Sequence, residues 1–503
     1  MSDKIQVHKK DESSLVITTE PSIDQEIREA FSYYAPNYRH MPAYKNKLWD
    51  GKIYQYNARS HTLPVGLLTD LRDFAHARNY EICEDESVSS YTASYDPVEF
   101  DRFVDTLSLR SAKDEPIRPR DYQIDAVRRV AQNPRAVLLS PTASGKSLII
   151  YMLVRLYQES SKCLLIVPTT NLVEQMYSDF LDYASDDDSF TEDMVHRIYG
   201  GKDRELSDQT RIVISTWQSI FRMPSEWFHQ FNMVIGDEAH NFKAKSLASI
   251  MNSCIHAHIR VGTTGTLDGS EVHEMLLKAL FGPIYVVTTT SSLIENQTLA
   301  QTKIDIIRLK YSEKIIKDFK SKGTKYTEEI SYITQLETRN NFIARLALSQ
   351  TSNTLVLYNH VETHGIPLYE LICDKLQGEN RNIYFISGKV KTENREHIRK
   401  QIENDTNSIL VASLGTFSTG INIRNLHNII FASPTKSQIR VLQSIGRGLR
   451  KHNDTSSTRV FDIVDDLSGW RKTKNYAFTH GIERARIYTK EKFNFDIHEL
   501  SIS

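Results

Sequence analysis

The sequence predicts an α/β fold in which two tandem domains with parallel sheets follow a small α+β domain. The 503 residues correspond to about three domains of ~150 residues each. Composition lies within the globular range, with 40% hydrophobic and 25% charged residues. Short apolar runs alternate with helical patterns in two successive series, as in βαβ units. We therefore expect an N-terminal domain over 1–108, a first α/β domain over 109–295 and a second over 296–503.

The N-terminal domain shows short strand patterns and amphipathic helical patterns. Residues 15–18 and 52–56 are typical of strands, whereas 23–34 and 66–80 are typical of helices. A polar stretch over 84–94 indicates a connection before the next helical pattern. Because each α/β domain should have its own core, removal of this unit should leave a folded remainder.

The two α/β domains are predicted from their buried strands. In the first domain the expected strands are 136–140, 163–168, 212–215, 233–236 and 259–262. In the second domain they are 354–358, 382–387, 409–412, 428–432 and 459–464. The end of the chain, including 480–495, is expected to form a helical tail.

Charge, cysteines and hydropathy exclude several classes of protein. The net charge of -1 excludes a uniformly basic nucleic-acid coat but permits local patches. Four scattered cysteines without a C-x-x-C pair predict neither a disulfide framework nor a zinc site. Because no apolar run is long enough to span a bilayer and the first residues are polar, we expect no membrane association and a cytoplasmic location, in the host if the source is a phage.

A phosphate-binding loop is predicted at SPTASGKS, residues 140–147. The segment follows an apolar strand, precedes an amphipathic pattern, and fits G-x-x-x-x-G-K-S except that Ser140 replaces the first glycine. Backbone N–H groups of the loop would cradle phosphate oxygens, Lys146 would add a cation, and Ser147 would bind Mg²⁺. The predicted nucleotide contacts of the loop are Thr142, Ala143, Ser144, Gly145, Lys146 and Ser147.

Two carboxylates end a later apolar strand in VIGDEAH, residues 234–240. Phosphoryl hydrolysis needs one carboxylate to hold Mg²⁺, here Asp237, and another to orient the attacking water, here Glu238. Such a pair alone is more often a solvated turn. Its combination with the upstream phosphate loop predicts an ATPase.

Together these motifs resemble those of superfamily-two helicases of the DEAH-lettered kind, and further motifs follow in that family's order. The resemblance implies RecA-like domains, with Gln123 reading adenine beside Arg120 and Tyr122, and GTTGT at 262–266 coupling ATP to nucleic acid. It implies nucleic-acid contacts at Pro168, Thr169, Thr170, Gly201, Thr216 and Trp217 in the first domain, and at Ser387, Gly388, Lys389, Ser413 and Thr416 in the second.

The second domain resembles the family at its nucleotide-facing motifs as well. QSIGRGLR, 443–450, implies that Gln443 faces ATP and that Arg447 and Arg450 reach the γ-phosphate. VASLGTFSTGINI, 411–423, places Gly420 beside the nucleotide, although Asn422 stands where many relatives carry Asp. Lys146, Asp237, Glu238, Gln443, Arg447 and Arg450 are the predicted catalytic residues.

Aromatic and basic residues alternate over 31–59 of the N-terminal domain. The rings could stack on bases or fill a small core, whereas Lys45, Lys47 and Lys52 are candidate phosphate contacts. This unit and the tail resemble the UvsW-like recombination helicases of large phages. That resemblance implies activity on branched DNA, namely replication forks, Holliday junctions and R-loops, alongside single-strand-binding and recombination proteins. A double-stranded DNA translocase without strand separation, an RNA/DNA-hybrid helicase and a scaffold with a vestigial ATPase are the alternatives.

Overall fold

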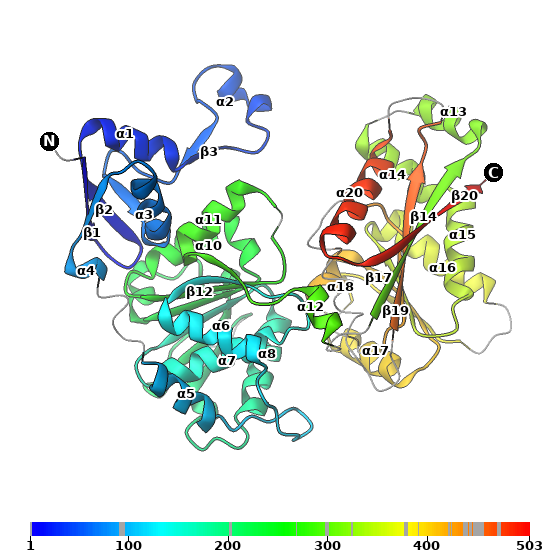
Figure 1. The fold of residues 1–503 in the computed structure, drawn as a ribbon. Coiled ribbons are helices and arrows are strands. Elements are labelled where there is room, and N and C mark those ends of the chain that lie inside the picture. The colour runs from blue at the N-terminus through cyan, green and yellow to red at the C-terminus, as the bar shows by residue number, and fades with distance from the viewer. Residues whose placement is uncertain are drawn as a thin grey trace. The chain divides into compact units, whose positions relative to one another are not determined.

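The computed structural model groups the chain into two compact units (Figure 1). One comprises Met1–Ser140 with Gly145–Val287, and the other comprises Pro141–Ser144 with Thr288–Ser503. The structure describes residues 3–89, 96–200, 204–267, 269–296, 301–322, 325–376, 381–390, 392–420, 423, 425–435, 441, 445, 457–469 and 474–502.

The N-terminal domain is a four-stranded mixed sheet covered by two helices. Its strand order is β5-β2-β1-β6, with β1 antiparallel to β2 and parallel to β6. The sheet strands are β1 (Lys4–Lys9), β2 (Ser14–Thr18), β5 (Thr62–Pro64) and β6 (Glu81–Glu84), and the covering helices are α1 (Pro21–Ala30) and α3 (Leu68–Ala77). Alternate residues of β1 and β2 are buried because successive strand side chains face opposite sides.

An arm, defined here as Ser32–Tyr54, extends beyond α1 (Figure 1). It is a two-stranded ribbon of β3 (Ser32–Tyr34) and β4 (Lys52–Tyr54) joined through η1 (Tyr38–His40) and α2 (Pro42–Lys45). The helix predicted over 23–34 is therefore too long, since α1 ends at Ala30. Tyr33 and Tyr34 pair across to β4, where aromatic side chains suit a pleated surface.

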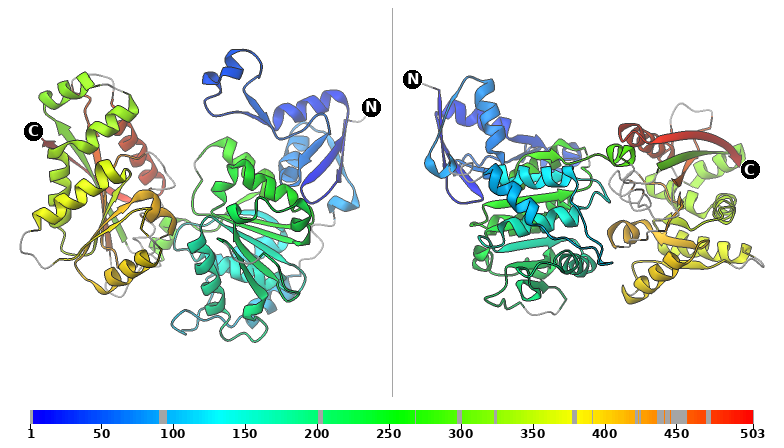
Figure 2. Two further views of the ribbon diagram at one scale, coloured as in Figure 1. Left: turned by 180° about the vertical axis from the view of Figure 1, so that it is seen from behind. Right: turned by 60° about the horizontal axis from the view of Figure 1, so that its bottom comes forward.

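The first α/β lobe contains a seven-stranded sheet in the order β13-β7-β12-β11-β8-β10-β9, with every pair parallel. Its strands are β7 (Arg135–Leu139), β8 (Cys163–Val167), β9 (Val195–Ile198), β10 (Ile212–Thr216), β11 (Met233–Asp237), β12 (Ile259–Thr264) and β13 (Ile284–Val286). The helical segments of this lobe are α5 (Pro97–Thr106), α6 (Asp121–Gln132), α7 (Lys146–Tyr157), α8 (Thr170–Tyr183), η4 (Glu192–Met194), α9 (Trp217–Ile220), η5 (Ser225–Gln230), η6 (Ala239–Lys243), α10 (Lys245–Ser253) and α11 (Glu271–Phe281). The short helix α4 (Glu86–Ser89) packs instead on β1 and β6 of the N-terminal domain, where Val88 joins the core. Helices cover both faces of the sheet (Figure 2), so the strands are apolar on both sides.

The second lobe repeats this architecture with the strand order β16-β17-β15-β18-β19-β14-β20, again parallel throughout. Its strands are β14 (Gln301–Tyr311), β15 (Thr354–Tyr358), β16 (Ile383–Ile386), β17 (Ile409–Ser413), β18 (Asn428–Phe431), β19 (Ser457–Asp466) and β20 (Asn494–Ile502). Its helices are α12 (Thr290–Glu295), α13 (Glu313–Lys322), α14 (Tyr326–Gln335), α15 (Glu337–Leu348), the π-helix η7 (Val361–Gly365), α16 (Ile366–Lys375), α17 (Thr392–Asn404), α18 (Leu414–Gly420) and α20 (Tyr476–Lys490). The predicted α/β fold with two parallel-sheet domains is confirmed.

The structure differs from the sequence prediction near residue 108 and at the C-terminal tail. Phe100 of α5 and Leu109 belong to the apolar core of the first lobe, on either side of the boundary expected at residue 108. The C-terminal tail is helical only over α20, and the chain then adds β20 to the edge of the second sheet. The division at 108 and 295 stays a prediction.

Candidate functional site

The predicted phosphate loop joins β7 to α7. Gly145 has φ +80°, and a Cβ there would collide with the side-chain amide of Gln123. Ala143 also has a left-handed backbone, with φ +67°, which is uncommon for a residue with a side chain. The buried Ser144 hydroxyl donates to the Pro141 carbonyl at 2.6 Å. These contacts fix the turn that leads into the N-terminus of α7, where free N–H groups favour anions.

Lys146 and Ser147 open α7, and both already have partners within the chain. The Lys146 ammonium donates to the Ser140 carbonyl at 3.4 Å. The Ser147 hydroxyl lies 2.9 Å from the hydroxyl of Tyr183, the last residue of α8. A phosphate and a cation would replace these contacts. Tyr183 was not predicted, because only the packing of α7 against α8 brings it to the loop.

Asp237 is the last residue of β11, and Glu238 comes directly after it. Asp237 is buried and accepts a hydrogen bond from the Thr263 hydroxyl at 2.8 Å. Burial, and then the neighbouring Glu238 charge, raise the pKa of Asp237, against the opposing charge of Lys146. Glu238 has a left-handed backbone with φ +51°. Such strain is concentrated at functional sites, where the surrounding structure holds it.

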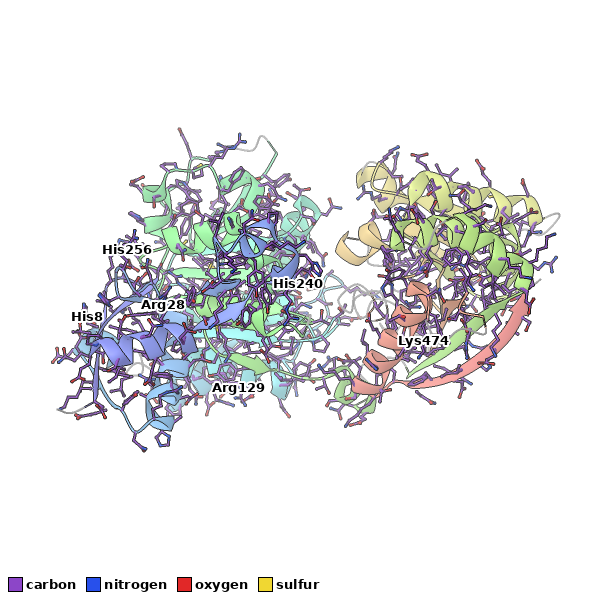
Figure 3. The ribbon with its side chains drawn as sticks, turned by 90° about the horizontal axis from the view of Figure 1, so that it is seen from above. His8, Arg28, Arg129, His240, His256 and Lys474 are labelled. Carbon is purple, nitrogen blue, oxygen red and sulfur yellow. The ribbon has the colours of Figure 1, made fainter. Side chains whose placement is uncertain are left out.

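His240, labelled in Figure 3, links this acidic motif to Thr264, the last residue of β12. Its Nδ1 lies 3.4 Å from the Glu238 carboxylate and 3.0 Å from the Thr264 hydroxyl. The Ser140 N–H in turn donates to the Thr264 carbonyl at 2.8 Å. The phosphate loop, the acidic motif and GTTGT are therefore joined by hydrogen bonds at one edge of the sheet.

The side chains at this edge fit a nucleotide with a divalent cation. The Ser147 hydroxyl and the Asp237 carboxylate offer oxygen ligands, which Mg²⁺ prefers. Burial, and then the neighbouring Glu238 charge, raise the pKa of Asp237, and a bound cation would stabilise its carboxylate against both effects. Beside the loop, Gln123 is buried and its side-chain oxygen accepts the Arg120 N–H at 2.9 Å. The Arg120 guanidinium donates to the Tyr122 hydroxyl at 2.9 Å, and adenine recognition by this group stays a prediction.

The first-lobe nucleic-acid candidates lie at the carboxyl ends of two adjacent strands. Thr169 caps α8 by accepting the Leu172 N–H, with Pro168 before it and Thr170 after it. Thr216 ends β10, where its hydroxyl lies 2.9 Å from that of Ser219 in α9, the helix that begins at Trp217. Since β8 and β10 are parallel neighbours, both groups share the edge that carries the phosphate loop.

The second-lobe candidates also meet at the ends of neighbouring strands. Ser387 follows β16, and Ser413 ends β17, where its hydroxyl donates to Thr416 at 2.6 Å. A Cβ on Gly388 would lie 3.8 Å from the Thr416 hydroxyl. Arg395 of α17 donates to the Gly388 carbonyl at 2.8 Å. The sequence did not point to Arg395, because its contact with the Gly388 carbonyl depends on the packing of α17, which no motif encodes.

Lys389 is paired with Glu362 at 2.7 Å in this second-lobe group. Gly420 is the last residue of α18. Five residues singled out from the sequence lie outside the described residues: Gly201, Asn422, Gln443, Arg447 and Arg450.

The three candidate lysines of the arm differ in their surroundings. Lys52 forms an ion pair with Glu29, and its ammonium lies 5.6 Å from the centre of the Tyr34 ring. Lys45 and Lys47 have no ion-pair partner among the residues that the structure describes. Arg28 of α1, labelled in Figure 3, places its guanidinium 4.5 Å from the centre of the Tyr54 ring. Two of the three lysines thus remain available to an anionic ligand.

The arm's aromatic residues are divided between core and surface. Tyr56, just beyond the arm, is buried in the core of the N-terminal domain. Tyr34 is 51% exposed and stacks on Tyr38 at 4.5 Å between ring centres. Tyr56 therefore fills the core of the N-terminal domain, whereas the exposed Tyr34 stays a candidate for stacking on a base.

Comparison with known proteins decides the family. Residues 4–85 match the N-terminal domain of the DNA helicase UvsW, 116–269 match the type III restriction enzyme res subunit, and 338–452 match the helicase conserved C-terminal domain. The ATP-dependent DNA helicase uvsW of Enterobacteria phage T4 is 36% identical over 509 residues, covering 98% of each chain. The chain belongs to the UvsW family of ATP-dependent DNA helicases.

Solved structures agree with this UvsW assignment. The crystal structure of T4 UvsW covers 100% of both chains at 35% identity, with a TM-score of 0.52. A type ISP restriction-modification enzyme, LlaBIII, covers 86% of this chain and 34% of its own at 14% identity, with a TM-score of 0.57, and shows the fold alone. The resemblance to the UvsW-like family, and the prediction of a helicase that uses ATP and acts on DNA, are confirmed.

No described helix is both long and apolar enough to cross a membrane. Asp305, Asp496 and His498 form a group with metal-ligand spacing. Asp305 is already paired with His498 at 2.9 Å and with Arg459 at 2.5 Å, so the group is a network of ion pairs.

Proposed function

We propose that this helicase acts on branched DNA, namely replication forks, Holliday junctions and R-loops, in recombination, repair and replication restart. The observation that carries the proposal is the arm, which presents the exposed Tyr34 ring, and Lys45 and Lys47, two lysines with no ion-pair partner in the described part of the chain. Contacts of this kind combine base stacking with phosphate binding, and they need no particular sequence. Single-strand-binding and recombination proteins are the partners expected to share such substrates.

The nucleotide site supports hydrolysis by positioned charges. Lys146 and the loop N–H groups would hold the phosphates, and Ser147 and Asp237 would hold Mg²⁺, whose charge would offset that of the phosphate oxygens. Glu238 accepts a hydrogen bond from the attacking water and orients it. The strained backbone of Glu238 and its contact with His240 restrict where that carboxylate points.

The second lobe is proposed to supply the remaining nucleotide contacts of the ATP site. Gln443 contacts the nucleotide, Gly420 lies beside it, and Arg447 and Arg450 bind the γ-phosphate, since a planar guanidinium matches phosphoryl oxygens. Cations supplied by a second domain tie hydrolysis to domain movement. The strand-end hydroxyl and glycine groups of both lobes then bind successive DNA phosphates, which converts that movement into stepping.

The ATP site is tested by Glu238→Gln, with Glu226→Gln, an exposed carboxylate of the same lobe, as the matched control. Glu238→Gln should bind ATP but lose steady-state, DNA-stimulated hydrolysis, because the amide cannot orient water as a carboxylate does. Lys146→Ala should lose hydrolysis by losing the phosphate cation. Wild-type turnover in either variant under saturating DNA and Mg²⁺ would refute these roles.

The branched-DNA proposal is tested on labelled forks, four-way junctions, R-loops, RNA duplexes and unbranched DNA duplexes with ATP. Lys45→Gln with Lys47→Gln should weaken fork binding and make log affinity less dependent on log salt, because fewer counterions are released. Lys317→Gln with Lys322→Gln on α13 removes the same charge as a control. ATPase activity without strand separation would indicate a duplex translocase, and unwinding confined to R-loops would indicate an RNA/DNA-hybrid helicase.

A further inference from the structure

The tip of the arm contains a hollow that the nucleotide site and the helicase motifs do not use. Its volume is about 600 Å³, within the range of pockets that take small organic ligands. The hollow is lined by Arg39, Tyr44, Lys45, Lys47, Leu48, Trp49 and Asp50. Three of these residues are cations and one is an acid.

The backbone holds the lining in place. The Leu48 N–H donates to the Ala43 carbonyl at 2.9 Å, and the Lys47 N–H donates to the Tyr44 carbonyl at 3.0 Å. The Trp49 indole N–H donates to the Lys52 carbonyl at 2.8 Å. Because the indole's only donor is occupied, the ring contributes its apolar surface to a ligand.

Leu48 is 80% exposed, although its backbone is ordered by this hydrogen bonding. An exposed apolar side chain held beside the half-buried rings of Tyr44 and Trp49 is typical of an interaction surface. Asp50, the one acid in the lining, is already engaged, since it accepts hydrogen bonds from the Tyr54 hydroxyl at 2.5 Å and the Lys52 N–H at 3.0 Å. Lys45 and Lys47 have no such partner within the described chain. The ligand is therefore anionic and has an apolar face.

We propose that this hollow binds one unpaired base at a DNA branch point, with Leu48 and Trp49 against the face of the base and Lys45 and Lys47 on the adjoining phosphates. This inference rests on the proposed action on branched DNA. In a duplex the base faces are covered by stacking, and only edges and phosphates are accessible. Leu48 has no group that hydrogen-bonds an edge, so it gains contact where a base is unstacked.

The experiment compares two forks that differ only in one unpaired nucleotide at the branch, which carries a base in one fork and is abasic in the other. The wild-type full chain should bind the fork with the base about tenfold more tightly, because one stacked base is lost from the other. Leu48→Ser should reduce this ratio toward one, and Leu48→Met should retain most of it. Val98→Ser, at another exposed apolar residue of the same unit, should leave the ratio unchanged. Affinities are measured by fluorescence anisotropy without nucleotide.

An equal wild-type affinity for the two forks would overturn the subsite. An equal loss of affinity for unbranched duplex in Leu48→Ser would also overturn it, since the leucine would then insert between paired bases. Failure of the branched-DNA proposal has a different signature, because the wild type would bind forks and duplexes alike. Lys45→Gln with Lys47→Gln should weaken both forks equally, since phosphates are present in each.

Discussion

The two lobes share a fold but neutralise their buried arginines in different ways. In the first lobe, Arg135 approaches the Glu12 carboxylate at 3.2 Å, and Arg260 donates to the Ser13 hydroxyl at 2.8 Å. Both partners belong to the turn between β1 and β2 of the N-terminal domain. In the second lobe the partners are carboxylates of its own strand β19, with Arg339 on Asp465 and Arg484 on Asp462, each at 2.7 Å.

The pKa shifts of these arginines follow their partners. Burial lowers the pKa of Arg135 to about 10 and that of Arg260 to about 9, despite the nearby Glu12. The carboxylates of β19 instead raise the pKa of Arg339 and of Arg484 above the usual value, against the opposing effect of burial. The carboxylates that act on these two first-lobe arginines, Glu12 and Asp11, therefore come from the N-terminal domain.

This difference bears on the prediction that the chain still folds without residues 1–108, which stays a prediction. A Cβ on Gly66 would collide with the Lys278 carbonyl of α11, so that domain is seated closely on the first lobe. Ala279 of α11 belongs to the N-terminal apolar core. Deletion of 1–108 would remove these contacts as well as Glu12, so single substitutions test the interface more cleanly. The arm is thereby tied to the lobe that carries the phosphate loop.

The largest expected effect is in the second lobe. Arg339→Met should lower the free energy of unfolding by about 3–5 kcal/mol, because Asp465 stays buried without its cation. Urea unfolding of the second-lobe transition measures this loss, with Lys322→Met of an exposed pair on α13 as the control. A loss below that of the control would mean that the Tyr311 hydroxyl, 2.6 Å from Asp465, compensates for the missing charge.

Glu12→Gln should have the next largest effect, about 2–3 kcal/mol on the first-lobe transition, since the buried Arg135 guanidinium would lose the charge of its Glu12 partner. Glu81→Gln removes an exposed carboxylate of the same domain, paired with Lys4 at 3.0 Å, and should change stability little. No loss in Glu12→Gln would mean that the first lobe does not depend on the N-terminal domain for its charge balance.

The sequence predicted what is local and missed what is formed by distant segments. Lys146, Asp237 and Glu238 were found because short motifs at strand ends place them together in any fold of this class. The sheet order, the two buried arginine networks and the Ser147–Tyr183 contact arise from packing between segments, which no periodicity encodes. Lys52 was grouped with Lys45 and Lys47 by composition, whereas the structure pairs it with Glu29 on α1.

A smaller effect is expected at Ser13. Ser13→Ala removes one acceptor of Arg260, but that guanidinium also donates to the carbonyls of Ala257 at 3.0 Å and Cys254 at 2.8 Å. The expected loss is about 1 kcal/mol, the usual contribution of one hydrogen bond. The shift of the first-lobe urea midpoint measures it, with Ser60→Ala on the domain's exposed loop as the control. A loss equal to that of Glu12→Gln would place the main anchor on Arg260 instead of Arg135.

The smallest effect should come from the half-exposed edge of the same interface, where Lys278 of α11 contacts Asp70 of α3 at 2.6 Å. Asp70→Asn should cost about 0.5 kcal/mol, because water screens the pair and both side chains lose freedom in forming it. The same urea measurement in low and high salt checks this, since a screened pair should contribute less still in high salt. Glu26→Gln, which breaks the exposed pair with Arg78 inside the domain at 3.0 Å, is the matched control. A salt-independent loss as large as that of Glu12→Gln would show that the edge, and not the buried arginine, holds the N-terminal domain on the first lobe.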